Sequence, residues 1–357
     1  MTAPIPIVIP AYQPDGRLQQ LLQQLCQWQN TPIVVVNDGS SPEYAPILNG
    51  VQRLLEAHGG VLLHHKTNLG KGAALKTGFE YLLAHCPNML GCVCADCDGQ
   101  HTPRDIQGVV DTLRQNPQAL VLGVRNFGQR RAPMLAKVGN AVTRRVFAFV
   151  AGQRVRDLAT GLRGVPRQLM QQCLDISTDH FEFEMQQLLN CAGRRQIVEV
   201  PVETLYWGEG HTHFDPVRDS AKIYRVLMAD FAVFLFSSLT ATALDMVLFW
   251  LFCGWFAPYL GSLYAAGATG AARVFSSLYS YTFNYKFVFH NHRWQAATMR
   301  RYVLLVAVQL TLSASLVTVL VHLLPTVAEV LLKICVDGVL FFGNYYLQRR
   351  YVFSPKG

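Results

Sequence analysis

Charged residues are spread unevenly along this chain of 357 residues, and their distribution divides it into two parts. Residues 1–225 contain 22 lysines and arginines and 19 acidic residues, whereas residues 226–357 contain only 9 and 4. A long apolar region with so few charges is typical of a protein segment that lies within a lipid bilayer. We therefore expect a water-exposed domain over residues 1–225 and a membrane domain over residues 226–357.

The second part contains four apolar segments, each close to the length of about 20 residues that a helix needs to cross a bilayer. They are residues 231–253, 260–281, 302–324 and 327–346. The basic residues around these segments lie either between the second and third or after the fourth: Lys286, Arg293, Arg300, Arg301, Arg349, Arg350 and Lys356. By the positive-inside rule we expect a multi-pass, all-α domain of the inner or cytoplasmic membrane, with both termini in the cytosol.

The start of the chain and its cysteines agree with a cytosolic first domain. Residues 1–11 have no basic region of the kind that begins a signal peptide, and prolines interrupt their apolar run. The nine cysteines of the chain form no pattern of a secreted disulfide framework.

A seven-residue pattern occurs twice in the membrane part. Residues 283–289 read FNYKFVF and residues 347–353 read LQRRYVF, each at the end of a predicted helix pair. Two helices per unit would give both copies the same orientation, as in parallel repeats. Chance similarity is the alternative, because aromatic and basic residues are common at membrane interfaces. We favour an internal duplication.

The first part alternates short β-branched runs with helical patterns. The predicted strands are residues 5–11, 33–37, 61–65, 91–96 and 119–123, and the predicted helices are residues 16–27, 44–58, 72–84 and 103–115. Such alternation predicts a Rossmann-like α/β domain with a mostly parallel sheet, in which ligands bind beyond the carboxyl ends of the strands. Two polar motifs, NDGS at residues 37–40 and DCD at residues 96–98, follow predicted strands.

The carboxylates of Asp96 and Asp98 are separated by one residue at a strand end. Such a pair can hold a divalent cation that also binds a diphosphate, because magnesium prefers oxygen ligands and keeps substrate phosphates in its shell. Taken alone the spacing is weak, since acidic turns exposed to solvent are common.

The order of the motifs is more specific. IVIPAY at residue 7, VVVNDGSS at 34, NLGKGAALKTGF at 68, DCDGQH at 96, DLATGLR at 157, FEFE at 181 and EVPV at 199 follow one another along the first part. Over residues 5–225 the chain resembles glycosyltransferase family 2, in particular the dolichyl- and polyprenyl-phosphate sugar synthases. The second part resembles the GtrA-like membrane family.

The resemblance implies a GT-A fold and a hexosyltransferase that makes lipid-linked monosaccharides for cell-envelope glycosylation. Its reaction would be the inverting transfer of a sugar from a UDP- or GDP-linked donor to a polyprenyl phosphate, with Mg²⁺ or Mn²⁺ as cofactor. From the composition we also expect contact with the bilayer, association of copies through the membrane domain and, because the basic excess is not a nucleic-acid signature, no nucleic-acid partner.

The resemblance also implies roles for individual residues. Pro10, Ala11 and Tyr12 match the loop around the nucleotide base, Asp38 the aspartate that binds base or ribose, and Asp96, Asp98 and Gln100 the metal-binding motif. Phosphate groups of the donor or the acceptor would be bound by Lys71, Arg125, Arg131 and Arg144. Sugar hydroxyls would be bound, or neighbouring groups oriented, by Asp157 and Glu182. The implied catalytic set consists of Asp96, Asp98, Asp157 and Glu182. In members of the family an acidic residue often follows the first loop directly, and in this chain Asp15 is the candidate for that position. For Glu182 an exposed helix start is an equal alternative.

The acceptor explains the absence of a serine, cysteine or histidine nucleophile constellation from the motifs. A lipid phosphate is already an anion at neutral pH, so it needs little help from a general base. Aligning it and neutralising the departing diphosphate remain as the main tasks of such an enzyme.

Basic residues concentrate between Arg125 and Arg167, where ten lysines and arginines accompany one acid, and such a stretch suits phosphates or an anionic membrane surface. Within it, residues 134–151 show apolar residues at spacings of three and four, flanked by Lys137, Arg144 and Arg145. We predict a helix in the plane of the membrane interface. The alternative is a helix packed on the sheet, because the same pattern serves both.

Other polar residues have simpler explanations. The cysteines of residues 92–97 could suggest zinc, but we favour buried core cysteines. In the membrane part, Asp245 and Arg273 should face the helix bundle, and Lys333 and Asp337 should pair along one helix.

Two other functions remain open from the sequence. One is a membrane glycosyltransferase that extends a glycan. The other is a non-catalytic flippase or scaffold that only binds nucleotide sugar.

Overall fold

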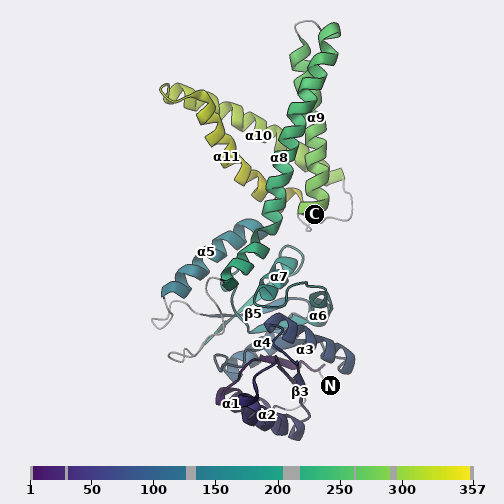
Figure 1. Cartoon of the computed structure of the whole chain (residues 1–357), viewed down its shortest axis with the longest axis vertical. Helices are drawn as coiled ribbons and strands as arrows, with labels where there is room; N and C mark the ends of the chain where they lie inside the picture. Colours follow the sequence, from purple (N-terminus) through teal and green to yellow (C-terminus); the bar gives the residue numbers. More distant parts are fainter. Residues whose placement is uncertain are drawn as a thin grey trace. The chain divides into compact units, whose positions relative to one another are not determined.

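A computed structural model describes residues 3–28, 31–125, 134–203, 218–260, 263–289 and 296–353. It contains two compact units, Met1–Leu227 and Met228–Gly357 (Figure 1). The first is an α/β domain and the second is helical, so the predicted fold classes are confirmed.

A seven-stranded sheet forms the centre of the first unit, with the strand order β3-β2-β1-β4-β6-β5-β7. The strands are β1 (Ile7–Ala11), β2 (Ile33–Asn37), β3 (Val61–His64), β4 (Gly91–Cys94), β5 (Leu120–Arg125), β6 (Arg163–Pro166) and β7 (Ile197–Val202). Neighbouring strands are parallel except at β6, which runs antiparallel to β4 and β5. The sequence predicted the first five strands and missed β6 and β7, because β6 is four residues long with a glycine and a proline, and β7 also contains a proline.

Helices cover both faces of the sheet. They are α1 (Gly16–Leu25), η1 (Pro42–Tyr44), α2 (Ala45–Ala57), α3 (Lys71–His85), α4 (Pro103–Gln115), α5 (Met134–Ala151), α6 (Arg167–Leu174) and α7 (Glu182–Cys191). Side chains alternate along β1, so Ile7 and Ile9 pack with α1, α2 and α4. Val8 points to the other face, where it lies against Gly78 of α3. Full burial of such an aliphatic side chain stabilises the fold by about 1.5–3 kcal/mol.

Local signals determine where the helices begin. Asp15 caps α1 by accepting a hydrogen bond of 2.9 Å from the Arg17 amide, and its carboxylate also pairs with the Arg17 guanidinium. Gly70 precedes α3 with a φ of +106°, a conformation that side chains with a Cβ rarely adopt. Asp15, the uncertain replacement for a binding acid, is therefore engaged as a helix cap.

The second unit contains α8 (Arg218–Leu260, which begins in the first unit), α9 (Tyr264–Phe283), α10 (Ala296–Leu323) and α11 (Glu329–Leu347). These helices cover most of the four predicted apolar segments. Among the described residues, α8 and α10 are long and apolar enough to cross a membrane, with mean hydropathies of 1.8 and 2.3. The crossing of the membrane by α9 and α11 stays a prediction.

Both copies of the seven-residue pattern have the same backbone conformation. Each contains a five-residue π-helical turn, η3 (Asn284–Val288) and η4 (Gln348–Val352). The buried Asn284 side chain donates a hydrogen bond of 3.1 Å to Gln348 Oε1, and the rings of Phe289 and Phe353 stack with centroids 4.6 Å apart. Equivalent residues of the two copies thus contact each other, as they would at a pseudo-two-fold axis. This arrangement supports the internal duplication.

The sequence predicted one ion pair on these helices, that of Lys333 with Asp337, and it placed Asp245 and Arg273 toward the bundle, whereas the Arg273 side chain is 51% exposed. Arg273 lies 3.4 Å from Asp245, which also accepts a hydrogen bond from Ser276. Lys333 lies 3.0 Å from Asp337 along α11.

Candidate active site

Polar side chains gather at one edge of the sheet. The strands β1, β2, β4 and β5 all point the same way, so their carboxyl ends meet there. Tyr12, Asp38 and Asp96 follow three of these ends, and Arg125 closes the fourth. This is the edge at which open α/β sheets bind their ligands.

Both carboxylate oxygens of Asp96 have partners. Lys71 Nζ lies 2.7 Å from Oδ1, and His101 Nε2 lies 3.3 Å from Oδ2. Gly161 packs directly against the carboxylate, since a Cβ at that position would lie 2.2 Å from Oδ2. The position of Asp96 is therefore fixed from three sides.

The charges of this group shift one another's pKa values. Burial opposes the ionisation of Asp96, but the charge of Lys71 and the contact with His101 outweigh it and hold the pKa of Asp96 well below its usual range. Burial, followed by the charge of Asp96, raises the pKa of Asp98. Burial alone would lower the pKa of Lys71, yet the charges of Asp96 and Glu184 raise it. At neutral pH the group therefore contains a charged ammonium between carboxylates.

The donor set suits a hard divalent cation. Asp96 and Asp98 offer carboxylate oxygens, and the backbone amide of Gln100 donates a hydrogen bond of 3.0 Å to Asp98 Oδ1. In the part of the chain that the structure describes, no three His, Cys, Asp or Glu side chains converge as metal ligands. Two carboxylates fit Mg²⁺ or Mn²⁺ bound together with a diphosphate, whose oxygens would supply further ligands.

Asp38 holds the glycine-rich loop in place. Its Oδ1 accepts a hydrogen bond of 2.9 Å from the Leu69 amide, and its Oδ2 accepts one of 2.9 Å from the Gly70 amide. His65 Nδ1 lies 2.7 Å from Oδ1, and Asp38 is only 3% exposed. Asp38 therefore positions the loop that leads to Lys71, in addition to the contact with base or ribose that the resemblance implies for it.

A buried ion pair fixes Arg125. Its Nε and Nη2 donate hydrogen bonds of 2.6 and 2.9 Å to the two oxygens of Asp157, which is fully buried. The Ala159 amide donates a further bond of 3.1 Å to Asp157 Oδ1. Asp157 thus orients the guanidinium of Arg125, and the geometry favours an orienting role for Asp157 over direct contact with the sugar.

Two carboxylates at the start of α7 are buried, contrary to the alternative of an exposed helix start. Glu182 is 8% exposed and Glu184 is 7% exposed. Glu182 Oε2 has no hydrogen-bond partner among the described residues. A buried acceptor of this kind is expected to meet a donor such as a sugar hydroxyl.

The loops after β1 and β2 are tied together beside Pro10, Ala11 and Tyr12. The Gln13 amide donates a hydrogen bond of 2.8 Å to Ser40 Oγ, and Gln13 Nε2 lies 3.3 Å from the Tyr12 hydroxyl. The register pairs Ala11 with Asn37, so the two motifs begin at the same level of the sheet. A nucleotide base next to Tyr12 would therefore also be close to Asp38.

Comparison with protein families gives two matches in sequence order. Residues 7–171 match the model of glycosyl transferase family 2, and residues 233–353 match the GtrA/DPMS transmembrane domain. This chain is a family 2 glycosyltransferase joined to a GtrA/DPMS transmembrane domain. It is a hexosyltransferase with a GT-A-like catalytic domain.

Several named relatives resemble this glycosyltransferase. Glycosyltransferase AglJ of Haloferax volcanii is 27% identical over 68% of this chain and 80% of its own length. A UDP-N-acetylglucosamine–dolichyl-phosphate N-acetylglucosaminyltransferase of Methanococcus voltae is 24% identical over 62% of this chain and 94% of its own. Polyprenol monophosphomannose synthase of Mycolicibacterium smegmatis is 27% identical over 48% of this chain and 64% of its own.

The structure of the glycosyltransferase domain brings most predicted site residues to one edge. Arg144 instead lies exposed on α5, and Arg131 lies outside the described residues. Sequence reasoning gave no role to His101, Gly161 or Glu184, although all three belong to motifs that carried the resemblance. The sequence does not indicate which residue a glycine or histidine of a motif will contact, because that partner comes from a distant part of the chain.

The cysteines near the site belong to the core. Cys92 and Cys94 are buried in β4, and Cys97 packs against the core cluster. Burial, followed by the charges of Asp96 and Asp98, raises the pKa of Cys97 to about 12, so its thiol is not a nucleophile at neutral pH.

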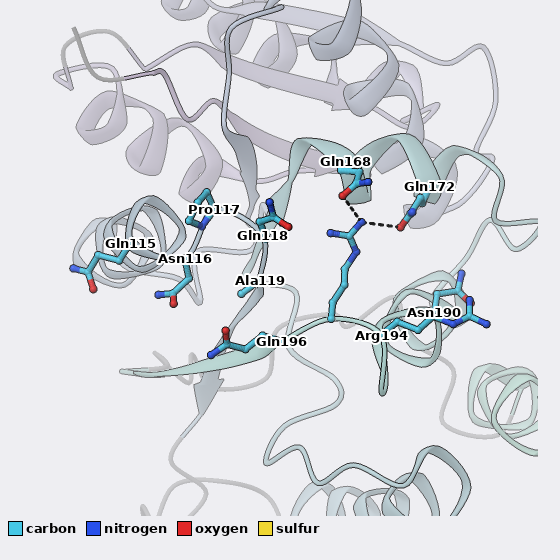
Figure 2. Close-up of a pocket in the computed structure, with 11 residues that line it drawn as sticks. Gln115, Asn116, Pro117, Gln118, Ala119, Gln168, Gln172, Asn190, Arg194 and Gln196 are labelled. Carbon is cyan, nitrogen blue, oxygen red and sulfur yellow. Dashed lines mark hydrogen bonds between the residues drawn. The ribbon is translucent and has the colours of Figure 1, made fainter. Parts of the chain in front are cut away.

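Figure 2 shows a pocket of about 870 Å³ at the opposite edge of the sheet, before the starts of β5 and β7. It is lined by Gln115, Asn116, Pro117, Gln118, Ala119, Gln168, Gln172, Asn190, Arg194, Arg195 and Gln196. Arg195 donates hydrogen bonds of 2.9 and 3.2 Å to Gln168 and Gln172. The pocket therefore lies at the end of the strands away from Asp96 and is separate from the candidate active site.

Proposed function

We propose that this enzyme transfers a sugar from a UDP- or GDP-linked donor to a polyprenyl phosphate, with inversion at the anomeric carbon. The observation that carries the proposal is the group of Asp96, Asp98 and Lys71 at the carboxyl edge of the sheet, the edge at which Asp157 orients Arg125. The relatives named for dolichyl-phosphate and polyprenol transfer support the acceptor class. The product would be a lipid-linked monosaccharide for cell-envelope glycosylation.

The residues divide the work of this reaction. Mg²⁺ or Mn²⁺ held by Asp96 and Asp98 would neutralise the departing nucleoside diphosphate. Arg125, oriented by Asp157, binds phosphate oxygens, and Glu182 accepts a hydrogen bond from the sugar. The acceptor phosphate attacks as an anion, so the side chains only have to align it and exclude water.

The decisive experiment incubates the purified full-length protein with labelled UDP- and GDP-sugars and polyprenyl phosphate. A labelled product that partitions into organic solvent and is released by mild acid supports the proposal. Label that appears only on an added glycan acceptor would favour the glycan-extending enzyme. Donor binding without any transfer would favour a flippase or scaffold.

Helix α5 is proposed as the place where the acceptor reaches the site. Val138 and Val142 are 54% and 45% exposed, whereas Val150 at the other end of the stripe is buried. Arg144 is exposed beside them. Apolar side chains exposed next to basic groups suit a helix in the membrane interface, and each basic residue adds about 1 kcal/mol of attraction to an anionic surface.

Changing both Arg144 and Arg145 to Glu is therefore expected to raise the apparent KM for polyprenyl phosphate at least tenfold, because the helix loses the attraction of two basic residues to the membrane surface. The KM for the nucleotide sugar should change less than about twofold, because the donor site is elsewhere. Steady-state kinetics with vesicles as acceptor carrier measure both constants. Arg53→Glu with Arg114→Glu makes the same charge change at exposed positions outside the site and serves as the control. Equal changes in both constants would refute the assignment.

The membrane topology is also a proposal. The asymmetry of basic residues predicts that the catalytic domain, the loop from Lys286 to Arg301 and Gly357 all face the cytosol. Reporter fusions at Gly357 and at the predicted outer loops should give opposite compartments. A fusion at Gly357 that reports the outer compartment would contradict four crossings.

A further inference from the structure

Lys71 links two carboxylates that come from different elements. It is the first residue of α3, directly after the glycine-rich loop. Its Nζ lies 2.7 Å from Asp96 Oδ1 and 3.1 Å from Glu184 Oε1, and its side chain is 18% exposed. An ammonium in this position neutralises the same carboxylate that a divalent cation would use.

The surroundings of Asp96 leave Oδ1 as the oxygen that a cation can reach most readily. His101 lies beside Oδ2, and Gly161 packs against both carboxylate oxygens, which restricts rotation of the carboxylate and leaves Oδ2 engaged by His101. A cation that binds Asp96 therefore most readily approaches the oxygen that Lys71 contacts. Two cations at one carboxylate repel each other strongly when water is largely excluded.

We propose that Lys71 is an internal counter-ion that competes with the divalent metal for Asp96, and that the donor diphosphate relieves this competition by pairing with Lys71. This inference rests on the proposed function. The phosphates bring negative charge to the start of α3, and the flexible four-carbon chain of Lys71 lets the ammonium move from the carboxylate to a phosphate oxygen. Metal and nucleotide then bind tightly only together, and each strengthens the other by the same factor.

Glu184 supports this exchange. It is 7% exposed, and its Oε1 is the second anion at the ammonium. Arg163 Nε lies 4.0 Å from the same oxygen, so Glu184 keeps a positive neighbour when Lys71 moves. Buried carboxylates without a partner are strongly unfavourable, and this arrangement avoids that state.

The test measures Mn²⁺ binding to the full-length protein in nanodiscs, from the electron paramagnetic resonance signal of free Mn²⁺. Without nucleotide, Lys71→Met should bind Mn²⁺ about tenfold more tightly than the unchanged protein, because the competitor is gone. Lys76→Met is the matched control: it lies on the same helix, its side chain is 17% exposed, and it pairs with Asp179. This control should leave the Kd unchanged.

The second measurement repeats the titration with saturating UDP or GDP. Nucleotide should tighten Mn²⁺ binding strongly in the unchanged protein and by a factor about tenfold smaller in Lys71→Met. Adding Asp98→Ala to Lys71→Met should remove the gain in affinity, which assigns the gain to the Asp96–Asp98 pair.

An unchanged or higher Kd in a folded Lys71→Met protein would overturn the inference. If circular dichroism shows that this variant does not fold, Lys71→Gln decides the question by the same titration. If the unchanged protein binds metal as expected but transfers no sugar, this result contradicts only the proposed function. An active enzyme whose Lys71→Met variant binds Mn²⁺ as before contradicts only the competition.

Discussion

Asp98→Ala is expected to lower the turnover number of sugar transfer by about a thousandfold, because the cation that neutralises the leaving diphosphate loses one of its two carboxylate ligands. Asp98 accepts a hydrogen bond from the Gln100 amide but forms no ion pair that the fold depends on within the described residues. The variant should therefore fold and insert normally. The measurement is the rate of labelled lipid formation at saturating Mg²⁺ or Mn²⁺.

Two comparisons make this result specific. Asp111→Ala removes a carboxylate from the surface of α4, where it pairs with Arg114 and accepts a hydrogen bond from Gln107, and should keep full activity. EDTA should inhibit the unchanged enzyme, and added Mg²⁺ or Mn²⁺ should restore it. A folded Asp98→Ala protein with near-normal turnover that ignores EDTA would rule out the metal assignment.

Asp157→Ala is expected to damage both the fold and the reaction. It leaves the guanidinium of Arg125 without its buried partner, and breaking a buried ion pair in this way destabilises a protein by about 3–5 kcal/mol. Because Arg125 is partly exposed, we expect a loss of stability near the lower of these two values. The variant should show a lower unfolding temperature, and the turnover should fall about a hundredfold because the phosphate-binding group is no longer oriented.

A double variant separates the two effects. Arg125→Met combined with Asp157→Leu replaces the pair by apolar side chains and should recover much of the lost stability, since such replacements are often neutral. The activity should not return, because the phosphate ligand is absent. Recovery of activity together with stability would show that the ion pair has only a structural role.

The sequence predicted those features that depend on neighbouring residues. Short apolar runs identified β1, β2 and β4, and the polar motifs after them identified the edge of the sheet that bears Asp38 and Asp96. The membrane segments followed from their length and their lack of charge. Pairing between distant side chains could not be predicted in this way. The contact of Lys71 with both Asp96 and Glu184 exists only because α3, β4 and α7 meet in the folded domain.

The same reason explains the antiparallel strand. β6 runs between β4 and β5 and brings the DLATGLR motif back to the active-site edge, where Gly161 supports Asp96 and Asp157 orients Arg125. Its sequence, RGVP, has little strand character of its own. Pairing with β4 and β5 on both sides imposes the strand conformation on β6. Only the folded structure therefore shows which residues β6 brings to the active-site edge.

The contact between Asn284 and Gln348 constrains how the membrane domain can change over time. The two amides meet across the pseudo-two-fold axis, so the space between the helix ends is filled jointly by one shorter and one longer side chain. A longer residue on one side has to be matched by a shorter one on the other. We therefore expect a substitution at Asn284 to be tolerated best together with a compensating substitution at Gln348, which ties sequence changes in the two duplicated halves to each other.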